Sequence, residues 1–157
     1  MSIRIGQGVD IHRVSDDPSR AMVLGGVRFD GPGLAGHSDA DAVAHAVTDA
    51  LLAAAGLGDI GQQFPDTDPS LEGADSMGLL ERAVAMLHDA GWAAVNVDCT
   101  VVADAPKIAP CRDEMQAGLT RVVGAPVTVK GRRTEGVGSL GAGEAVVALA
   151  VALVETR

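Results

Sequence analysis

Aromatic side chains are almost absent from this sequence. They make up 2% of the 157 residues, with no Tyr and only Phe29, Phe64 and Trp92. So few rings exclude a surface that stacks successive nucleic-acid bases. The core must instead come from Ala, Val, Leu and Ile, and small side chains each bury little area. We therefore expect a subunit of marginal stability that is stabilised by oligomerisation.

An excess of basic charge is also lacking. Lys and Arg number 12 against 21 Asp and Glu, which gives a formal net charge of −9. This balance argues against nucleic acid or an anionic membrane as a partner. A polyanionic small molecule stays possible, because metal ions or helix dipoles can reverse the sign of a site locally.

Targeting and membrane-spanning signals are missing as well. Residues 1–8 lack an apolar segment of the signal-peptide kind, and no apolar run reaches 18 residues. Cys99 and Cys111 show no metal-type spacing, and we interpret them as reduced thiols. With 47% hydrophobic and 21% charged residues, the sequence predicts one globular domain over residues 1–157, located in the cytoplasm.

The hydrophobic pattern mixes strands and helices without strict alternation. Strands are predicted at 3–9, 21–29, 95–102 and 127–130, and helices at 38–54, 75–90, 110–123 and 143–155. The first two strands are expected to pair as a hairpin. This order favours an α+β fold, a two-layer α/β sandwich with a four- to five-stranded mixed sheet covered by helices, ferredoxin-like in style.

Three residues form a candidate metal site. Asp10 and His12 lie two apart on the first strand and share a face. His45 lies in the first helix, four residues from both Asp41 and Asp49, and such carboxylates commonly orient a ligating imidazole. Two His and one carboxylate leave a position open, as in catalytic zinc sites. Non-haem iron accepts the same set, so the residues alone do not name the metal.

Further polar residues follow in two loops. A helix starting at Ser38 would present free N–H groups to a phosphate, with His37 and Ser38 as added donors; an ordinary N-cap is the alternative. The polar loop 58–73 carries Asp59 and Asp66, which are suited to sugar hydroxyls unless the loop is merely solvated. Glu135 follows a short strand and is a candidate for holding Mg²⁺.

Several stretches together resemble the 2-C-methyl-D-erythritol 2,4-cyclodiphosphate synthase family, from Ile5 to Leu153. They occur in the same order and with the same spacing as in that family. These stretches are residues 8–13 (GVDIHR), 36–41 (GHSDAD) with His45, 49–52 (DALL), 56–61 (GLGDIG), 64–69 (FPDTDP), 73–76 (GADS), 105–107 (APK) and 134–136 (TEG).

The resemblance implies a reaction and a set of ligands. It implies that a CDP-linked methylerythritol 2-phosphate is cyclised with release of CMP. It also implies a homotrimer with active sites between subunits, with zinc or manganese on Asp10, His12 and His45, and Mg²⁺ or Mn²⁺ on Glu135 at the diphosphate. The implied catalytic residues are His37, Arg133 and Glu135. The implied substrate-binding residues are Asp10, His12, His37, Ser38, Asp59, Ile60, Gly61, Phe64, Pro65, Asp66, Thr67, Asp68, Ala103, Asp104, Ala105, Pro106, Lys107, Ile108, Ala109, Arg132, Arg133, Thr134 and Glu135.

One departure from the family pattern concerns the phosphate site. The family usually has Ala-Thr-Thr-Thr-Glu where this chain has Gly-Arg-Arg-Thr-Glu at residues 131–135. Arg133 thus replaces a hydroxyl that helps to stabilise the transferring phosphate. Arg is a strong phosphate partner, so it either substitutes for the hydroxyl or holds the product and slows release. A family member with weakened cyclisation is therefore the main alternative. A non-haem iron oxygenase explains neither the phosphate-type helix start nor the acidic loop.

Overall fold

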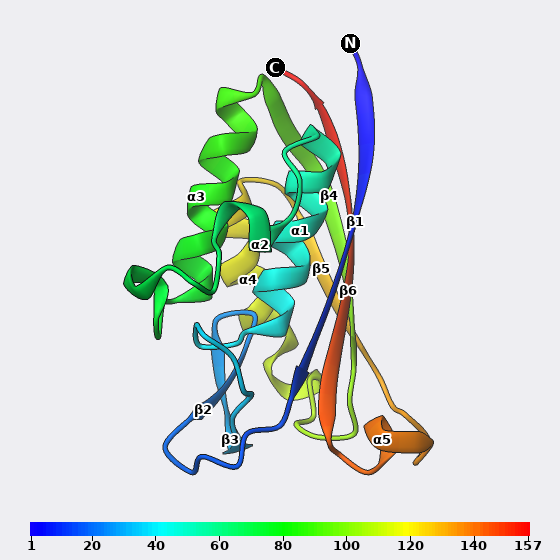
Figure 1. Ribbon diagram of the computed structural model, residues 1–157. Coiled ribbons are helices and arrows are strands. Elements are labelled where there is room, and N and C mark those ends of the chain that lie inside the picture. The colour runs from blue at the N-terminus through cyan, green and yellow to red at the C-terminus, as the bar shows by residue number, and fades with distance from the viewer.

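One layer of the fold is a four-stranded mixed sheet (Figure 1), in a computed structural model that describes residues 1–157. Its strand order is β1-β6-β4-β5. β6 pairs antiparallel with both β1 and β4, whereas β4 and β5 run parallel. The strands are β1 (Ile3–Arg13), β4 (Trp92–Val102), β5 (Val127–Arg132) and β6 (Ala145–Thr156). The predicted α+β class and mixed sheet are confirmed.

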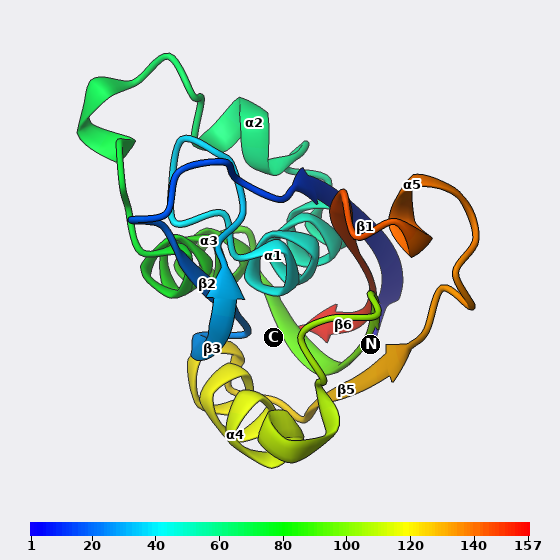
Figure 2. The same cartoon turned by 90° about the horizontal axis from the view of Figure 1, so that it is seen from below.

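Helices form the second layer and cover one face of the sheet (Figures 1 and 2). The three long helices are α1 (Ala42–Ala55), α3 (Ser76–Asp89) and α4 (Arg112–Val123). Short helices occupy the connections, namely α2 (Ile60–Gln63), η1 (Pro69–Leu71), η2 (Ala109–Cys111) and α5 (Gly138–Gly141). As composition predicted, the core between the layers contains mainly Ala, Val and Leu.

The predicted helix at 143–155 is wrong, because this segment is strand β6. Burial alternates along it: Val146, Ala148, Ala150, Ala152 and Val154 are buried, and the residues between them are more exposed. Both faces of the strand are apolar, so the sequence shows no polar alternation. A continuous apolar run cannot be told from a buried helix by periodicity alone.

The predicted strand at 21–29 is two strands that make their own sheet. β2 (Ala21–Leu24) and β3 (Val27–Pro32) pair antiparallel around Gly25 and Gly26. Both glycines have positive φ, 60° and 74°, the backbone that tight hairpin turns favour. The expected pairing of the first strand with this segment is therefore wrong, and β1 pairs with β6 instead.

The face of the sheet away from the helices, which we call the open face, is largely apolar. Its apolar part consists of Ile3, Ile5, Val9 and Ile11 of β1 with Val147, Leu149, Val151 and Leu153 of β6. The two strands set these side chains opposite one another, as in the pairs Ile5–Leu153, Val9–Leu149 and Ile11–Val147. Ile5 and Ile11 are 72% and 62% exposed. A contiguous exposed apolar surface of this kind is typical of an interaction site.

Two glycines of β1 let α1 lie directly on the strand. A Cβ on Gly6 would stand 2.0 Å from the Ala50 carbonyl oxygen, and one on Gly8 2.0 Å from that of Ala46. No side chain fits at such distances. Gly8 precedes Asp10 by two residues and shares its face, so this close contact brings Asp10 to α1 at the level of His45.

The first helix begins at Ala42 rather than at Ser38. Its N-cap is Asp41, whose carboxylate accepts hydrogen bonds from Val43 N and Ala44 N, each at 3.0 Å. The same carboxylate accepts from Gly25 N at 2.8 Å and Gly26 N at 2.7 Å, which ties the β2–β3 turn to the helix. After Ser38, the N–H groups of Asp39, Ala40 and Asp41 donate to Ala74 O, Ser38 Oγ and Asp39 Oδ1, so these groups are used within the fold and do not face a phosphate.

Candidate metal centre and substrate cavities

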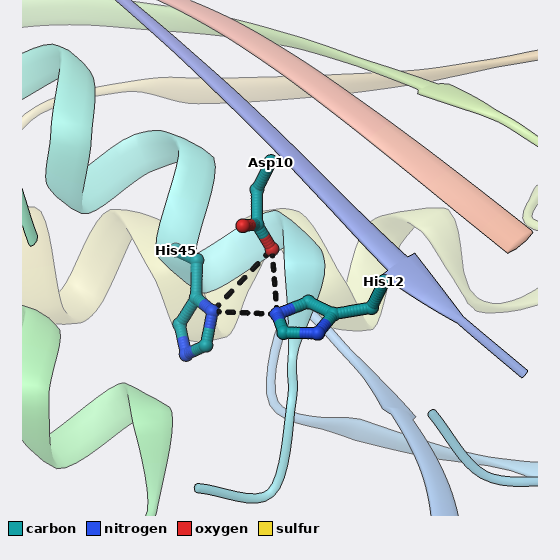
Figure 3. A group of neighbouring side chains, drawn as sticks. All are labelled: Asp10, His12 and His45. Carbon is teal, nitrogen blue, oxygen red and sulfur yellow. Dashed lines mark hydrogen bonds and ion pairs between the residues drawn. The ribbon is translucent and has the colours of Figure 1, made fainter. Parts of the chain in front are cut away.

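Asp10, His12 and His45 converge as predicted (Figure 3). Asp10 and His12 project from the helix-covered face of β1, and His45 projects from α1 towards them. Asp10 Oδ2 lies 3.0 Å from His12 Nε2 and 3.4 Å from His45 Nδ1, and the two nitrogens are 3.2 Å apart. One oxygen and two imidazole nitrogens thus meet at a single point.

The environment of Asp10 suits a cation. Its Oδ2 is buried and makes no well-formed hydrogen bond. Burial alone would raise the pKa of Asp10, but the adjacent imidazoles of His12 and His45 outweigh burial and lower it to about 2. For His12, burial lowers the pKa, yet the Asp10 carboxylate outweighs it and the pKa is raised. A permanent carboxylate that stabilises positive charge at this point fits a divalent metal ion.

His12 is oriented from behind by the backbone. Its Nδ1 lies 2.7 Å from the Ala35 carbonyl oxygen, which can only accept a hydrogen bond. Nδ1 therefore carries a proton, and in the neutral ring Nε2 presents a lone pair towards Asp10 and His45. This is the arrangement of a metal ligand whose second nitrogen is fixed by an outer partner.

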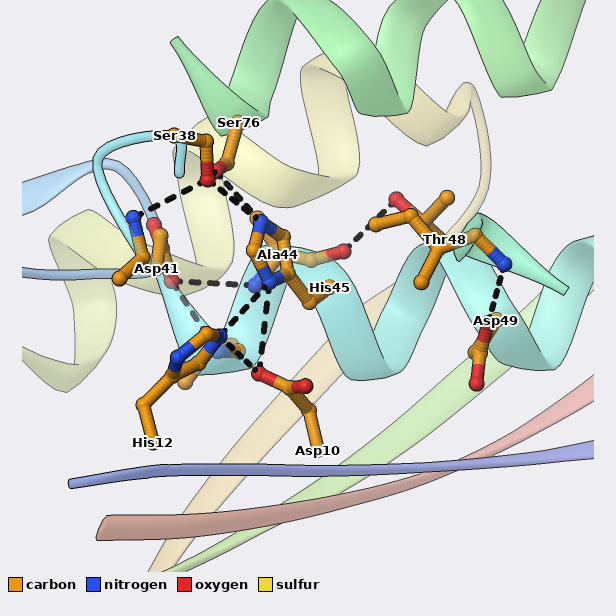
Figure 4. Close-up of polar contacts among 12 residues, drawn as sticks. Asp10, His12, Ser38, Asp41, Ala44, His45, Thr48, Asp49 and Ser76 are labelled. Atoms are coloured by element: carbon orange, nitrogen blue, oxygen red, sulfur yellow. Dashed lines mark hydrogen bonds and ion pairs between the residues drawn. The ribbon is translucent and has the colours of Figure 1, made fainter. Parts of the chain in front are cut away.

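The expected roles of Asp41 and Asp49 are wrong, because neither carboxylate contacts His45 (Figure 4). Asp41 caps α1, as described above, and Asp49 Oδ1 accepts from Ile60 N at 2.7 Å, which fastens α2 to α1. Residues four apart on a helix share a face, but here each carboxylate is bound to backbone N–H groups.

A cavity of about 400 Å³ opens beside the three metal-site residues. Its other lining residues are Gly36, His37, Ser38, Ile60, Gly61, Phe64, Asp66, Leu71 and Leu79. His37 Nε2 lies 3.0 Å from the Asp68 carbonyl oxygen, so the loop before α1 is joined to the acidic loop. The cavity thus combines the metal site, the His37–Ser38 pair and part of the loop 58–73.

Other residues of the acidic loop serve its own backbone. Asp59 caps α2 and accepts from Gln62 N at 2.8 Å, and Asp68 caps η1 and accepts from Ser70 N at 2.9 Å. Asp59, Pro65, Thr67 and Asp68 do not line the cavity. The structure therefore brings Ile60, Gly61, Phe64 and Asp66 to the metal site and leaves the other predicted loop residues at its edge.

A second cavity, of about 240 Å³, lies elsewhere on the chain and shares no lining residue with the first. It contains four cationic side chains, those of Lys107, Arg112, Arg132 and Arg133. Most of the predicted 103–109 segment lines it, namely Ala103, Asp104, Pro106, Lys107, Ile108 and Ala109, whereas Ala105 lines a third cavity. This concentration of positive charge in a chain of net charge −9 suits an anionic ligand.

Asp104 organises the segment that follows β5. It accepts hydrogen bonds from the Thr134 hydroxyl and from Thr134 N, the latter at 3.1 Å, and Arg133 Nε lies 3.6 Å away. The Thr134 hydroxyl, followed by its N–H and then Arg133, lowers the pKa of Asp104. Glu135 lines neither cavity, so a single chain does not bring it to Asp10, His12 and His45.

Sequence reasoning missed three residues that shape the first cavity. Arg20 donates to the Leu34 carbonyl at 2.6 Å and to the Ser38 carbonyl at 2.7 Å, and so holds the loop that carries His37. Ser76 and Asp39 form hydrogen bonds behind His45. Neither periodicity nor local spacing could indicate these contacts, since the partners are far apart in the sequence.

Fold and site together describe an α+β protein with a candidate metal centre and a separate cavity lined by cationic side chains, and the comparisons specify its family. The YgbB family model matches residues 3–155, and the chain belongs to this family. It is 52% identical over 159 residues to 2-C-methyl-D-erythritol 2,4-cyclodiphosphate synthase of Dechloromonas aromatica, covering 99% of this chain and 98% of that protein.

Solved structures agree with this assignment. The CDP complex of IspF from Plasmodium falciparum matches with a TM-score of 0.86 at 31% identity, covering 99% of this chain and 97% of that one. The bifunctional IspDF of Campylobacter jejuni matches with a TM-score of 0.93 at 35% identity. There the match covers 99% of this chain and 43% of the longer protein.

Proposed function

We propose that this protein is a cyclodiphosphate synthase of non-mevalonate isoprenoid precursor synthesis. It converts 4-diphosphocytidyl-2-C-methyl-D-erythritol 2-phosphate to 2-C-methyl-D-erythritol 2,4-cyclodiphosphate and CMP. The observation that carries this proposal is the meeting of Asp10, His12 and His45 in the first cavity, within a chain that matches synthases of this name over nearly its full length.

The reaction is an intramolecular phosphoryl transfer of the phosphorus–oxygen lyase class. An oxygen of the substrate 2-phosphate bonds to the β-phosphorus, and the bond from that phosphorus to the bridging oxygen breaks. The electron pair leaves with CMP, so no protein nucleophile is required. Holding both ends of one substrate supplies proximity. Zinc or manganese on the three metal-site residues, with Mg²⁺ or Mn²⁺ on Glu135, would offset the repulsion between the reacting anions.

Different residues around the two cavities are proposed to bind different parts of the substrate. His37 and Ser38 are proposed to donate to the phosphates, and the segments 59–61 and 64–68 to bind the ribose and methylerythritol parts. The segment 103–109 is proposed to hold cytosine. Arg132, Arg133, Thr134 and Glu135 are proposed to act on the diphosphate, with His37, Arg133 and Glu135 as catalytic residues. Four cationic side chains in the second cavity support its assignment to the anionic part of the substrate.

The open face supports a homotrimer. Its Ile, Leu and Val side chains have no helix over them and would be covered by neighbouring subunits (Figure 1). Because the two cavities of one chain share no lining residue, we propose that the first cavity of one subunit meets the second cavity of its neighbour. Each active site then needs two subunits.

A cytoplasmic location completes the proposal. Cys99 and Cys111 are both free thiols, and burial raises the pKa of Cys99 to about 12, which keeps that thiol protonated. Such thiols suit a reducing compartment. None of the helices combines the length and apolarity that crossing a bilayer demands.

A CMP-release assay with the CDP-linked substrate and Mg²⁺ tests the activity, and chromatography of the cyclic product confirms it. His45→Ala should abolish both metal binding and CMP release while the oligomer persists. Mixing His45→Ala subunits with Lys107→Glu subunits should restore part of the activity, because one mixed interface carries both intact halves. Absence of CMP release from the zinc-loaded wild type would refute the proposal.

The pair Arg132 and Arg133 supports a second candidate function, that of a family member in which cyclisation is weakened. Arg132 and Arg133 line the second cavity and Arg133 is largely exposed there, so both can reach a bound phosphate. Arg133→Thr separates the two cases. A large rise in kcat in this variant would favour the weakened enzyme, and a fall would make Arg133 a catalytic residue.

A further inference from the structure

The second ring nitrogen of His45 faces two buried hydroxyls. Its Nε2 lies 2.8 Å from Ser76 Oγ and 3.1 Å from Ser38 Oγ (Figure 4). Ser76 is fully buried, and Ser38 and His45 are only 8% and 9% exposed. Ser76 opens α3 and His45 lies on α1, so the contact joins two helices at the metal site.

Asp39 fixes the direction of these hydrogen bonds. Its Oδ1 is hydrogen-bonded to Ser76 Oγ, and its two oxygens also accept from Asp41 N at 3.1 Å and Ser76 N at 3.2 Å. A carboxylate only accepts, so the Ser76 hydroxyl donates to Asp39. The Ser76 oxygen then has only lone pairs for His45, and His45 Nε2 must carry the proton.

The consequence appears on the opposite side of the His45 ring. With the proton on Nε2, Nδ1 presents a lone pair towards Asp10 Oδ2 and His12 Nε2. His12 reaches the same state through the Ala35 backbone carbonyl, which no side-chain substitution removes. His45 reaches it through the side chains of Ser76 and Asp39, which substitutions can remove one at a time.

We propose that Asp39 and Ser76 are positioning residues for the metal centre. Ser76 holds His45 in the tautomer whose Nδ1 is free to bind a metal, and Asp39 holds Ser76 in the orientation that accepts from His45. The proposal rests on the metal site of the proposed function, but not on the cyclisation reaction. A merely structural role would predict a loss of stability with unchanged metal affinity in the folded protein.

Zinc affinity of Ser76→Ala is the first test, measured by competition with a chelator on protein shown to be folded by circular dichroism. We expect binding to weaken by about 10- to 100-fold, the usual cost of removing an outer partner of a ligating histidine. Asp39→Asn keeps the size of the side chain and should weaken binding several-fold. Affinity within about twofold of wild type for folded Ser76→Ala would overturn the proposal.

Ser19→Ala is the matched control. Ser19 Oγ donates to Asp17 Oδ1 at 2.7 Å, a serine–aspartate pair of the same kind that lies on the surface. Its removal should leave zinc affinity unchanged. A similar loss of affinity in Ser19→Ala and Ser76→Ala would show a general effect of losing a serine–aspartate pair, and would overturn the proposal.

Nitrogen-15 NMR of the imidazoles in the wild-type, metal-free protein needs no variant to fold. At an alkaline pH where the ring signals no longer move with pH, His45 should show a protonated Nε2 and a bare Nδ1, with its signals assigned from His45→Gln. The opposite tautomer would overturn the proposal. If zinc affinity falls as expected but the wild type releases no CMP, the proposed function fails and the positioning role stands.

Discussion

The two faces of the sheet are both apolar but differ in side-chain size. Under α1, the helix-covered face of β1 and β6 presents Gly6, Gly8, Ala148, Ala150 and Ala152, with the larger Val146 and Val154 at the two ends of the β6 row. The apolar part of the open face presents Ile, Leu and Val. The small residues let the backbone of α1 approach the strands. The large residues of the open face leave an exposed apolar surface that another chain can cover. The first face therefore sets the geometry of the site within one chain, and the second is suited to contacts between chains.

The metal residues belong to the first face. Asp10 and His12 continue the row of Gly6 and Gly8, and His45 lies on the helix that those glycines admit. Displacing α1 from β1 should therefore disturb the metal site directly. Changes to the open face should leave the site intact and act on assembly alone.

Gly8→Ala should have the largest effect. The added methyl group would stand 2.0 Å from the Ala46 carbonyl oxygen. Because this oxygen belongs to the backbone of α1, the helix itself would have to move away from β1. We expect the free energy of unfolding to fall by more than ~3 kcal/mol and zinc binding to be lost, as checked by urea denaturation and chelator competition.

Gly118→Ala in α4 is the control for that change, since the nearest atoms to its new methyl group, Gly25 O and Met77 Cε, are both 3.9 Å away. It should stabilise the protein by about 0.5–1 kcal/mol. Equal effects of the two substitutions would show that Gly8 is not a point of close approach.

The double substitution Ile5→Lys with Ile11→Lys tests the open face. Both residues are exposed in the isolated chain, so the fold should persist, but two charges per subunit would be buried on association. We expect the proposed trimer to weaken by at least ~100-fold, or about 2.7 kcal/mol, with CMP release lost and zinc binding retained.

Light scattering at micromolar concentration reports this outcome. Ala85→Lys with Ala117→Lys places the same charges on exposed positions of α3 and α4 and should leave the mass unchanged. An unchanged mass for the open-face variant would mean that this face is not the interface.

Adjacent residues of β6 allow the two faces to be compared at one point. Ala150 is 1% exposed and faces the helices, whereas Val151 is 46% exposed on the open face. Ala150→Leu should overpack the layer under α1, cost about 1–3 kcal/mol and weaken zinc binding. Val151→Leu should cost less than about 0.5 kcal/mol and leave zinc binding unchanged. Equal zinc affinities in the two variants would contradict the separation of the faces.

The sequence predicts the parts of this molecule that depend on local pattern. The spacing of Asp10 and His12 on a strand places these two on one face. His45 is added to them because carboxylates flank it in the helix; the residue does reach the site, but those carboxylates bind backbone N–H groups instead. The apolar pattern of β6 does not suffice to identify a strand, because both faces of β6 are apolar. One face packs under the helices, and the other belongs to the open face. The assignment of β6 as a helix was wrong for that reason.

The local sequence pattern does not indicate contacts between segments that are far apart in the chain. Asp41 and Asp49 lie close to His45 in sequence, yet both bind backbone N–H groups, while the partner of the ring is Ser76 on another helix. The role of Gly8 is equally hidden, since a single glycine in a strand predicts a bulge as readily as a close helix. Such contacts follow from how the layers pack.

The smallest effect is expected at the polar edge of the open face. Asp98 of β4 accepts from Lys130 of β5 and from the Thr128 hydroxyl at 2.8 Å, and these partners, Lys130 foremost, lower the pKa of Asp98. Because the pKa is depressed, the pair stabilises the fold above the ordinary value of 3.8 and loses this contribution as the pH falls through the lowered pKa. The side chains of Asp98 and Lys130 are 48% and 41% exposed, so solvent screens the pair. Asp98→Asn should then cost less than ~0.5 kcal/mol in urea denaturation, constant from about pH 7 to about pH 5 and smaller still in roughly 1 M salt. A cost above ~1.5 kcal/mol that persists in salt would mean that a neighbouring subunit covers this edge too, and the interface would then extend from the apolar strands across to β5.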